Sequence, residues 1–482
     1  MAEKTEQKVE MKKTLSTVNI VSLSIAFIGP AAYGVGFLQI VAATTDIGPA
    51  IALAPLIGTL ACIFTAVSVA VLAIKFAYSG GIYSYTRVAF GPAPAFLTGW
   101  TILLAYLLLP ATGAMFIGVY MPVLTNIVGI SFPFQGLIWA LIFGAIMTVF
   151  AYIGIKTSAK SMTIILLVQY ALIFAVAIAA IYKGISTPGT NFTAPLNPAL
   201  APGGWGAISA AGFTFFFAYY GFEATTSFAG ETKNPYKSCA WGAIYAILIV
   251  GLIYILWGWA LALPYTNNLP ASWDVFKLAI TASGDMAPVA QDLFGLAGVA
   301  VIASAIVISA FGSGTASSCS VSRILWQMGD DGLLPKKLNK LHKRFASPYV
   351  AALLTGFVTA IVPIIFFAVG YSMLQGFTFM ALWCAWAVIL MYMVVNLDNL
   401  VINRKESLKS AKNIALKFIL PIIGFVLMAY LFYGAGIVPI AIGAWTVPVL
   451  VLGLIWEAVG IIYLLYIRQT KPDVFKLGMR GV

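Results

Sequence analysis

Residues 29–36 read Gly-Pro-Ala-Ala-Tyr-Gly-Val-Gly, in the middle of an apolar stretch that runs from Thr17 to Ala42. Pro30 has no amide hydrogen and clashes with the preceding helical turn, and glycine tolerates backbone angles that other residues resist. A second stretch, Tyr-Tyr-Gly-Phe-Glu at residues 219–223, interrupts another apolar segment. About ten apolar residues flank each interruption, which places both near mid-membrane. We therefore predict two helices that are broken inside the membrane.

The composition of the chain is that of a membrane protein. It has 482 residues, of which 61% are hydrophobic and only 9% are charged, whereas a soluble domain carries about 25% charged residues. This excludes an ordinary soluble domain and also a disordered chain, which would be poor in apolar residues. Four scattered cysteines without a CxxC pair, and a single histidine, His342, indicate neither a disulfide framework nor a metal site.

Stretches of about 20 apolar residues, each long enough to cross a bilayer, divide the chain into membrane spans. We predict an all-α integral membrane protein with twelve transmembrane helices: residues 17–42, 48–74, 94–126, 134–155, 161–182, 206–230, 238–263, 288–320, 349–369, 374–395, 418–435 and 443–466.

The positive charges support this number of spans and their orientation. With the N-terminus in the cytoplasm, all of the 27 Lys and Arg residues except Lys183 and Lys277 fall on the cytoplasmic side, as the positive-inside rule requires. One missed span would reverse the loops after it and destroy the bias. The formal charge of +12 therefore needs no nucleic acid partner, and the lipid bilayer is the expected surroundings. Both termini are predicted to be cytoplasmic, in the plasma membrane.

The two broken spans occupy corresponding positions in two halves of the chain. Successive spans cross the membrane in alternating directions, so span six, five spans after span one, crosses in the opposite direction. This is typical of an inverted repeat. The predicted units are a segment at 1–16, repeats at 17–182 and 206–396, accessory spans at 418–467 and a tail at 468–482. Broken helices persist only where freed backbone groups line a cavity or are buried in protein. At such a break, the N-terminal end of one half-helix offers N–H groups to an anion and the C-terminal end of the other offers carbonyls to a cation, which suits a zwitterionic solute. The alternative is that the glycines only allow close packing of helices.

Three motifs carry a resemblance to a known superfamily. The first is Ser-Gly-Gly-Ile-Tyr-Ser-Tyr-Thr-Arg at 79–87, followed by Phe-Gly-Pro at 90–92 and Thr-Gly-Trp at 98–100. The second joins residues 220–223 to Gly-Glu-Thr-Lys-Asn-Pro at 230–235. The third is Ser-Arg-Ile-Leu at 322–325 with Met-Gly-Asp-Asp-Gly-Leu-Leu-Pro at 328–335 and Ser-Pro at 347–348. In this order they resemble the amino acid, polyamine and organocation (APC) permease superfamily, with the chain similar to prokaryotic-type amino acid transporters.

The resemblance implies a leucine-transporter-like fold with a 5+5 inverted repeat and discontinuous spans one and six. In that family the substrate carboxylate rests on the unwound part of span one, here Tyr33–Gly36, and the amino group meets carbonyls of span six, here about Phe217–Gly221. The substrate-binding residues that it implies are Ala32, Tyr33, Gly34, Val35, Gly36, Phe216, Phe217, Tyr219, Tyr220, Gly221 and Phe222.

Glu223 is the ionisable residue inside the sixth span. Such groups are costly in a membrane and usually face a cavity or a partner. Burial favours the neutral carboxyl, so Glu223 is predicted to exchange a proton or act in gating; a purely structural carboxyl is the alternative.

The coupling ion is left open between H⁺ and Na⁺. Some family members place a lysine amine in span five, where this chain has Gln169. Span eight offers Ser313, Thr315 and Ser317 for a sodium site, although such hydroxyls also commonly pack membrane helices. No other cofactor is expected.

The predicted function is a secondary active transporter of amino acids that works by alternating access as a symporter or exchanger, and not an enzyme. Neutral or broadly accepted amino acids are favoured because Glu223 is the one strong anionic candidate; a polyamine or cationic amine permease or antiporter is the alternative. A phosphate-binding loop for ATP is absent. An ion channel is a further alternative, although no filter-like repeat is present. The oligomeric state is left open.

Overall fold

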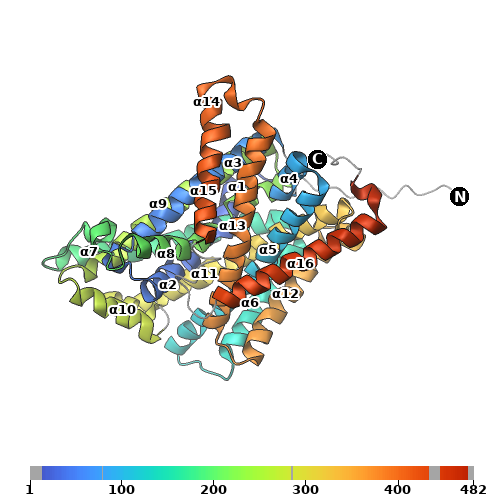
Figure 1. Ribbon diagram of the computed structural model, residues 1–482. Helices are drawn as coiled ribbons and strands as arrows, with labels where there is room; N and C mark the ends of the chain where they lie inside the picture. Colours follow the sequence, from blue (N-terminus) through green and yellow to red (C-terminus); the bar gives the residue numbers. More distant parts are fainter. Residues whose placement is uncertain (1–12, 77, 79, 284–285, 434–445, 476–482) are drawn as a thin grey trace.

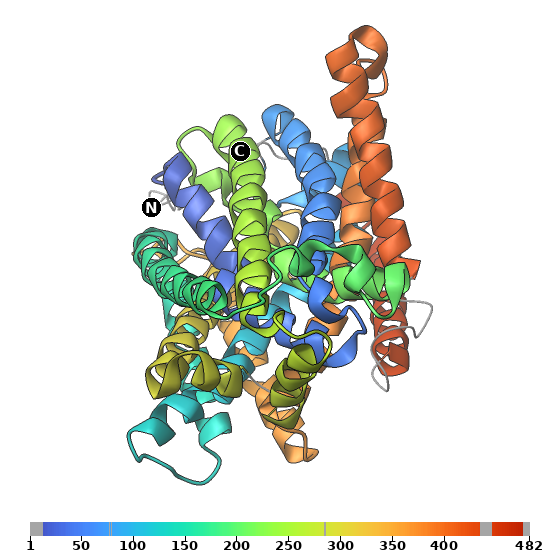
Figure 2. The same ribbon diagram turned by 90° about the vertical axis from the view of Figure 1, so that its left-hand side faces the viewer.

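A computed structural model describes residues 13–76, 78, 80–283, 286–433 and 446–475. Every named element in these ranges is a helix, and the one β-type contact is an isolated bridge between Leu15 and Thr232. Figures 1 and 2 show an elongated bundle from which one helical hairpin projects.

The first half of the chain begins with three short helical pieces in series, followed by four long helices and the short helix α4. In chain order these are α1 (Thr17–Ile28), η1 (Pro30–Val35), α2 (Gly36–Thr44), α3 (Leu53–Lys75), α4 (Ile82–Phe90), α5 (Pro92–Ile127), α6 (Gln135–Ile153) and α7 (Ile155–Ser186).

The second half repeats this arrangement of short pieces followed by long helices. It consists of α8 (Gly204–Phe216), η5 (Phe217–Tyr219), η6 (Phe222–Glu231), α9 (Pro235–Ala262), α10 (Ala271–Ser283), α11 (Ala287–Asp330), α12 (Tyr349–Ala368) and α13 (Met373–Asn403). The last elements are α14 (Ala411–Ile414), η10 (Ala415–Ile419), α15 (Leu420–Phe432) and α16 (Thr446–Thr470).

Eleven helices in the described ranges are long and apolar enough to cross a membrane. Each of these helices corresponds to one of the twelve predicted spans. The predicted span at 206–230 has no counterpart among them. Its α-helical part, α8, has 13 residues, after which the chain continues as two 3₁₀ segments. The chain is therefore a multi-pass membrane protein in which the sixth predicted segment is interrupted. The predicted end of the eleventh span, residue 435, and the predicted start of the twelfth, residue 443, lie outside the described residues.

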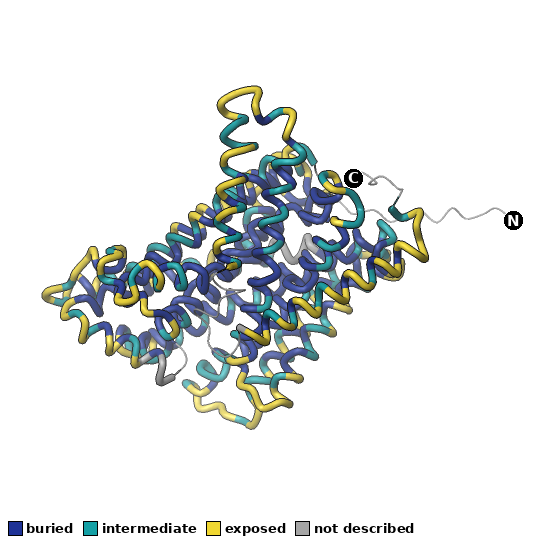
Figure 3. The backbone as a smooth tube through the Cα atoms, in the orientation of Figure 1, coloured by how far each residue is buried: buried dark blue, intermediate teal, exposed yellow. Residues whose placement is uncertain are grey.

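The helices divide into an inner group and an outer group. In the most apolar window of each span, 94% of the residues are buried for Thr17–Thr44 and 89% for α5, but only 22% for α6 and 17% for the last span. Figure 3 shows the same division, with buried backbone in the centre and exposed residues along the periphery. Apolar side chains on the outer helices, such as Val149 and Leu454, are exposed. The outer group therefore presents the lipid-facing surface, and the broken segments lie in the core.

Basic residues mark one end of the bundle, here called the basic end: Lys75 ends α3, Lys233 follows η6, Lys337 lies after α11 and Arg404 follows α13. The start of the described chain lies at this end, where the amides of Thr14 and Leu15 both donate to the carbonyl of Glu231, at 2.8 and 2.9 Å. The projecting hairpin of α13, α14 and α15 also extends from this end (Figure 1).

Candidate functional site

The first helix break is at Gly29. Helix α1 ends there because Gly29 adopts a left-handed conformation (φ 66°, ψ 63°) and its amide caps the last turn. Pro30 follows at the first position of η1, a π-helical turn, where its missing amide hydrogen costs no helical bond. The predicted unwound stretch, Tyr33–Gly36, was placed four residues too late. Those residues are helical, since the amide of Tyr33 donates to the carbonyl of Gly29.

The second break is at Tyr220 and Gly221. Tyr220 is extended (φ −69°, ψ 143°) and Gly221 has φ 119°, a value that favours glycine. A Cβ atom at Gly221 would lie 2.1 Å from Cδ1 of Phe27. The break therefore requires glycine both for its backbone angle and for the close approach of α1. This agrees with the predicted interruption of span six.

The two breaks lie against each other. The hydroxyl of Ser24, on α1, donates to the carbonyls of Gly221 and Phe222, at 3.2 and 3.0 Å. The carbonyl of Gly221 also accepts a hydrogen bond from the amide of Ala224 at 3.1 Å, so the hydroxyl of Ser24 is an additional donor that joins α1 to the second break. The sequence elements that were predicted to form one site are thus brought into direct contact.

Aromatic rings fill the space beside the two breaks. Tyr33 packs edge-on to Phe217, with ring centroids 5.3 Å apart, and parallel to Phe377 at 6.2 Å. Phe116 stacks on Phe377 at 4.2 Å, and Tyr220 contacts Phe217 at 5.0 Å. Each of these side chains is at most 2% exposed. We call Tyr33, Phe37, Phe116, Phe217, Tyr220 and Phe377 the aromatic cluster; it is closed to solvent in this structure.

Three of the predicted binding residues, Tyr33, Phe217 and Tyr220, belong to the aromatic cluster, and the others lie beside it. Phe216 and Phe222 pack on Tyr392, with ring centroids 5.8 and 5.0 Å apart. Tyr219 points to α3, where its hydroxyl donates to the carbonyl of Pro55 at 2.6 Å. Gly34 lies against Tyr254, and the hydroxyl of Tyr254 donates to the carbonyl of Ala218 next to the second break. The other residues predicted from span one, Ala32, Val35 and Gly36, are buried in η1 and at the start of α2.

Glu223 lies directly beside the second break and accepts three hydrogen bonds. The hydroxyls of Tyr106 and Tyr392 donate to its two oxygens, each at 2.5 Å, and the amide of Gly221 donates at 3.0 Å. The side chain is buried, and none of these three partners carries a positive charge. Three neutral donors suit a carboxylate, whereas a protonated carboxyl needs an acceptor and would have to give up or reverse one of these bonds.

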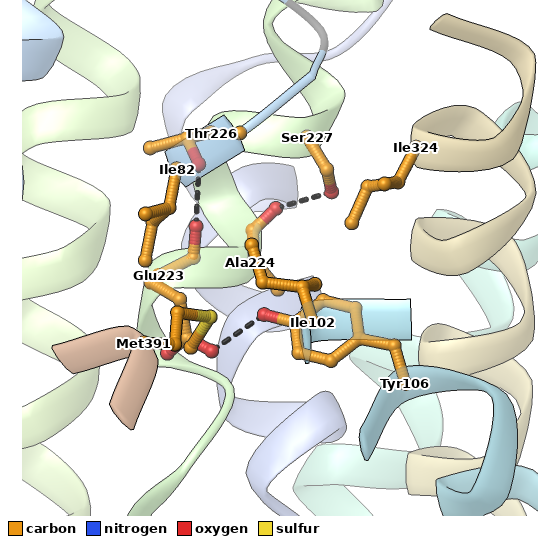
Figure 4. Close-up of a pocket in the computed structure, with 10 residues that line it drawn as sticks. Ile82, Ile102, Tyr106, Glu223, Ala224, Thr226, Ser227, Ile324 and Met391 are labelled. Atoms are coloured by element: carbon orange, nitrogen blue, oxygen red, sulfur yellow. Dashed lines mark hydrogen bonds between the residues drawn. The ribbon is translucent and has the colours of Figure 1, made fainter. Parts of the chain in front are cut away.

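A small cavity of about 10 Å³, on the order of one water molecule, adjoins Glu223. Its lining includes Tyr106, Ser227 and Ile324, and Figure 4 shows Glu223 and Tyr106 joined by a hydrogen bond at this cavity. Residues 222–231 lead from the break to the basic end, so the cavity lies between Glu223 and that end.

The serines of α11 make different contacts from one another. Ser313 donates to the carbonyl of Phe27 at 2.6 Å, and the amide of Ala31 donates to Ser309 at 3.1 Å. Ser317, in contrast, donates to Gly314 of its own helix, and the Thr315 hydroxyl is buried without a hydrogen-bond partner. Of the three residues predicted for a sodium site, only Ser313 therefore reaches the carbonyl end of α1. Among the described residues, no group of three His, Cys, Asp or Glu side chains is placed to hold a metal ion.

Two buried ion pairs join helices at the basic end. Arg323 of α11 makes a two-pronged contact with Glu231, at the end of η6. Arg87 of α4 pairs with Asp331 at 3.0 Å, and the hydroxyl of Tyr83 donates to the same carboxylate at 2.7 Å. These contacts close the protein between the second break and the basic end.

The sequence comparisons agree with this geometry. The model of the amino acid permease family matches residues 15–463. The chain belongs to the amino acid permease family. This permease is 28% identical to the branched-chain amino acid permease BcaP of Bacillus subtilis over 74% of its own chain and 76% of that relative. It is also 27% identical to the low-affinity putrescine importer PlaP of Escherichia coli K12 over 96% of its own chain and 95% of that relative.

A solved structure, that of MhsT in complex with L-phenylalanine, superposes on this permease with a TM-score of 0.60. The alignment covers 88% of the permease and 99% of MhsT at 16% identity, so the likeness is one of fold. It confirms the predicted leucine-transporter-like fold with discontinuous spans one and six, and the family matches confirm the predicted superfamily.

Several residues at the site had no signal in the sequence. Tyr106, Phe116, Phe377 and Tyr392 come from long helices, α5 and α13, in which aromatic residues are common and no motif distinguishes them. Only the packing of these two helices against the breaks selects them. Tyr106 and Tyr392 differ from other aromatics only in contacting Glu223.

Proposed function

We propose that this permease is a secondary active transporter of amino acids in the plasma membrane, with cytoplasmic termini, which works by alternating access. The observation that carries the proposal is the contact between the two helix breaks beside an enclosed aromatic cluster. Backbone groups released by broken helices can bind the charged ends of an amino acid. The aromatic rings would surround its side chain, and the family match supports this class of substrate.

Neutral amino acids are the favoured substrates. The acidic side chains that are buried in the described ranges are Glu223, Glu231, Asp398 and Asp331, and Asp331 is paired with Arg87. Glu231 is paired with Arg323, and Asp398 accepts a hydrogen bond from Thr86 on α4, so only Glu223 lies at a break. A diamine has two ammonium groups and needs more than one anionic partner. Polyamine transport is the second candidate because the putrescine importer aligns along 96% of the chain.

A proton at Glu223 is the favoured means of coupling. Protonation would change the hydrogen bonds that join Gly221, Tyr106 and Tyr392, and these belong to the second break, α5 and α13. The proton would thus alter how span six is held by its neighbours. Opening would further require separation of the ion pairs Glu231–Arg323 and Arg87–Asp331 at the basic end, which is then the cytoplasmic end. Sodium held near Ser313 is the alternative coupling ion.

Counterflow in proteoliposomes tests the carrier function. Vesicles preloaded with unlabelled leucine should accumulate labelled leucine transiently, and preloaded putrescine should not support this exchange. Counterflow with putrescine instead would identify the second candidate. Large unitary currents without counterflow would contradict a carrier and favour a channel. Repeating the uptake with and without sodium and across pH separates the coupling ions.

A further inference from the structure

A cleft of about 480 Å³ opens at the basic end, apart from the aromatic cluster. Its walls come from the end of α3, the end of α4, and the end of α13 with the turn that follows. The transport mechanism proposed above makes no use of this cleft.

The rim of the cleft carries more positive than negative charge. Lys75, Arg404 and Lys405 line it together with one carboxylate, Glu406. Glu406 is already bound by two ammonium groups, Lys75 at 2.8 Å and Lys417 at 2.6 Å. These hydrogen bonds, first that of Lys417, lower the pKa of Glu406 to about 2. Within the described residues, no carboxylate lies within ion-pair distance of Arg404 or Lys405, and both side chains are exposed.

The wall below the rim is apolar. Val88 is 40% exposed, and Phe76 and Ile402 are partly exposed. Helices α3 and α13 are both membrane spans and end at Lys75 and Asn403. The rim therefore lies where membrane-spanning helices meet the aqueous phase, which is the level of lipid headgroups.

We propose that this cleft binds an anionic phospholipid, with the headgroup phosphate between Arg404 and Lys405 and an acyl chain along Val88. Basic pockets between membrane helices suit such headgroups. A soluble anion would match the charge but would gain nothing from the apolar wall. The bound lipid would link α4 to the end of α13, the helix that carries Tyr392. It would do so near the existing contact between Thr86 of α4 and Asp398 of α13, at 2.8 Å.

The test is native mass spectrometry of the full-length permease in detergent, with added dioleoyl-phosphatidylglycerol or dioleoyl-phosphatidylcholine. The double variant Arg404→Gln/Lys405→Gln should bind phosphatidylglycerol at least about tenfold more weakly, since each cation near a headgroup is worth ~1 kcal/mol. The matched control is Lys409→Gln/Lys412→Gln, which removes the same charge from exposed positions between α13 and α15 that do not line the cleft. Equal losses in both variants would show general surface attraction and overturn the proposal. Similar melting temperatures establish that both variants are folded.

Two further arms distinguish a lipid from a soluble anion. Inorganic phosphate and glycerol phosphate at millimolar concentration should not displace phosphatidylglycerol, and Val88→Asn should weaken its binding with all charges retained. Displacement by these soluble anions, with no effect of Val88→Asn, would identify a free-anion site and overturn the lipid assignment. Equal retention of phosphatidylcholine would also overturn it.

Discussion

The two helix breaks solve the same problem with different chemistry. At the first break, the neutral hydroxyls of Ser309 and Ser313 from α11 pair with the backbone on either side of Gly29. At the second, the carboxyl of Glu223 pairs with the amide of Gly221 and with two tyrosine hydroxyls. Backbone groups released in a membrane must find partners in both cases. Only the second set can change with proton binding, which suggests a fixed first break and a switchable second one.

The largest effect is expected from Gly221→Ala, compared with Gly29→Ala. A Cβ atom would lie 2.1 Å from Phe27 at Gly221, but no closer than 3.0 Å to any neighbour at Gly29. Overpacking adds ~1–3 kcal/mol to the ~1–2 kcal/mol of a left-handed non-glycine residue. Gly221→Ala should therefore abolish transport, and Gly29→Ala should reduce it less, in proteoliposome uptake assays.

Gly129→Ala provides the control for backbone strain alone. Gly129 has φ 76°, and a Cβ atom there would have no neighbour within 4 Å, so alanine should lower the melting temperature slightly and leave uptake nearly unchanged. If Gly29→Ala and Gly221→Ala behaved alike, the close approach of Phe27 would not be what distinguishes the two breaks.

The next effect concerns Glu223→Gln and its matched control Glu457→Gln. Glutamine has only one acceptor oxygen, so one of the three buried donors to Glu223 loses its partner, which costs ~1–3 kcal/mol. If this cost raises the transport barrier, the transport rate falls about tenfold. Glu457 accepts a hydrogen bond from the hydroxyl of Thr101 at 2.7 Å and is partly exposed on α16. We expect a transport loss and a flattened pH profile only for Glu223→Gln. An unchanged pH profile would contradict proton coupling at this residue.

A smaller effect separates Ser313→Ala from Ser317→Ala. Ser313 bonds to Phe27 across two helices, whereas Ser317 bonds within its own helix. Interhelical bonds of this kind average ~0.6 kcal/mol in membrane proteins, so the melting temperature should fall more for Ser313→Ala. If sodium is the coupling ion, the sodium concentration for half-maximal uptake should also rise for Ser313→Ala alone. Equal changes in both variants would argue against a special role for Ser313.

The smallest effect is expected outside the breaks, at Glu406. The hydrogen bonds of Lys417 and Lys75 lower its pKa from 4.5 to about 2. Because the folded pKa lies below the unfolded one, the carboxylate stabilises the folded protein above about pH 4.5, and this contribution is lost as the pH falls towards 2. Glu406→Gln should thus lower the melting temperature slightly at pH 7, and the difference from the unsubstituted protein should shrink between pH 5 and pH 3. A constant difference would exclude this titration.

Sequence reasoning located the breaks well because their cause is local. Gly29, Pro30 and Gly221 act through their own backbone limits, and these limits are readable wherever such residues interrupt an apolar run. The unwound stretch was predicted at Tyr33–Gly36 because a run of small residues does not reveal at which residue the helix ends. In the structure the helix ends at Gly29, whose left-handed backbone caps α1, and residues 30–35 form a π-helical turn.

The chemical surroundings of the breaks were less predictable. Glu223 stood out as a charge in an apolar segment, but Tyr106 and Tyr392, which hold it, did not. Likewise, the α11 hydroxyls formed a visible row, while the division between Ser313, which reaches α1, and Ser317, which does not, depends on how α11 is rotated against α1.

The sequence by itself determined that this chain crosses the membrane many times and that two of its spans are broken. Apolar length and the backbone limits of glycine and proline are properties of short segments. Only the tertiary structure decided that the breaks touch, that six rings from η1, α2, α5, η5, α13 and the second break lie beside them, and that Glu223 meets two tyrosines. In a chain that is apolar almost everywhere, hydrophobicity does not specify which helix faces meet, so close packing and the pairing of a few buried polar groups make that choice.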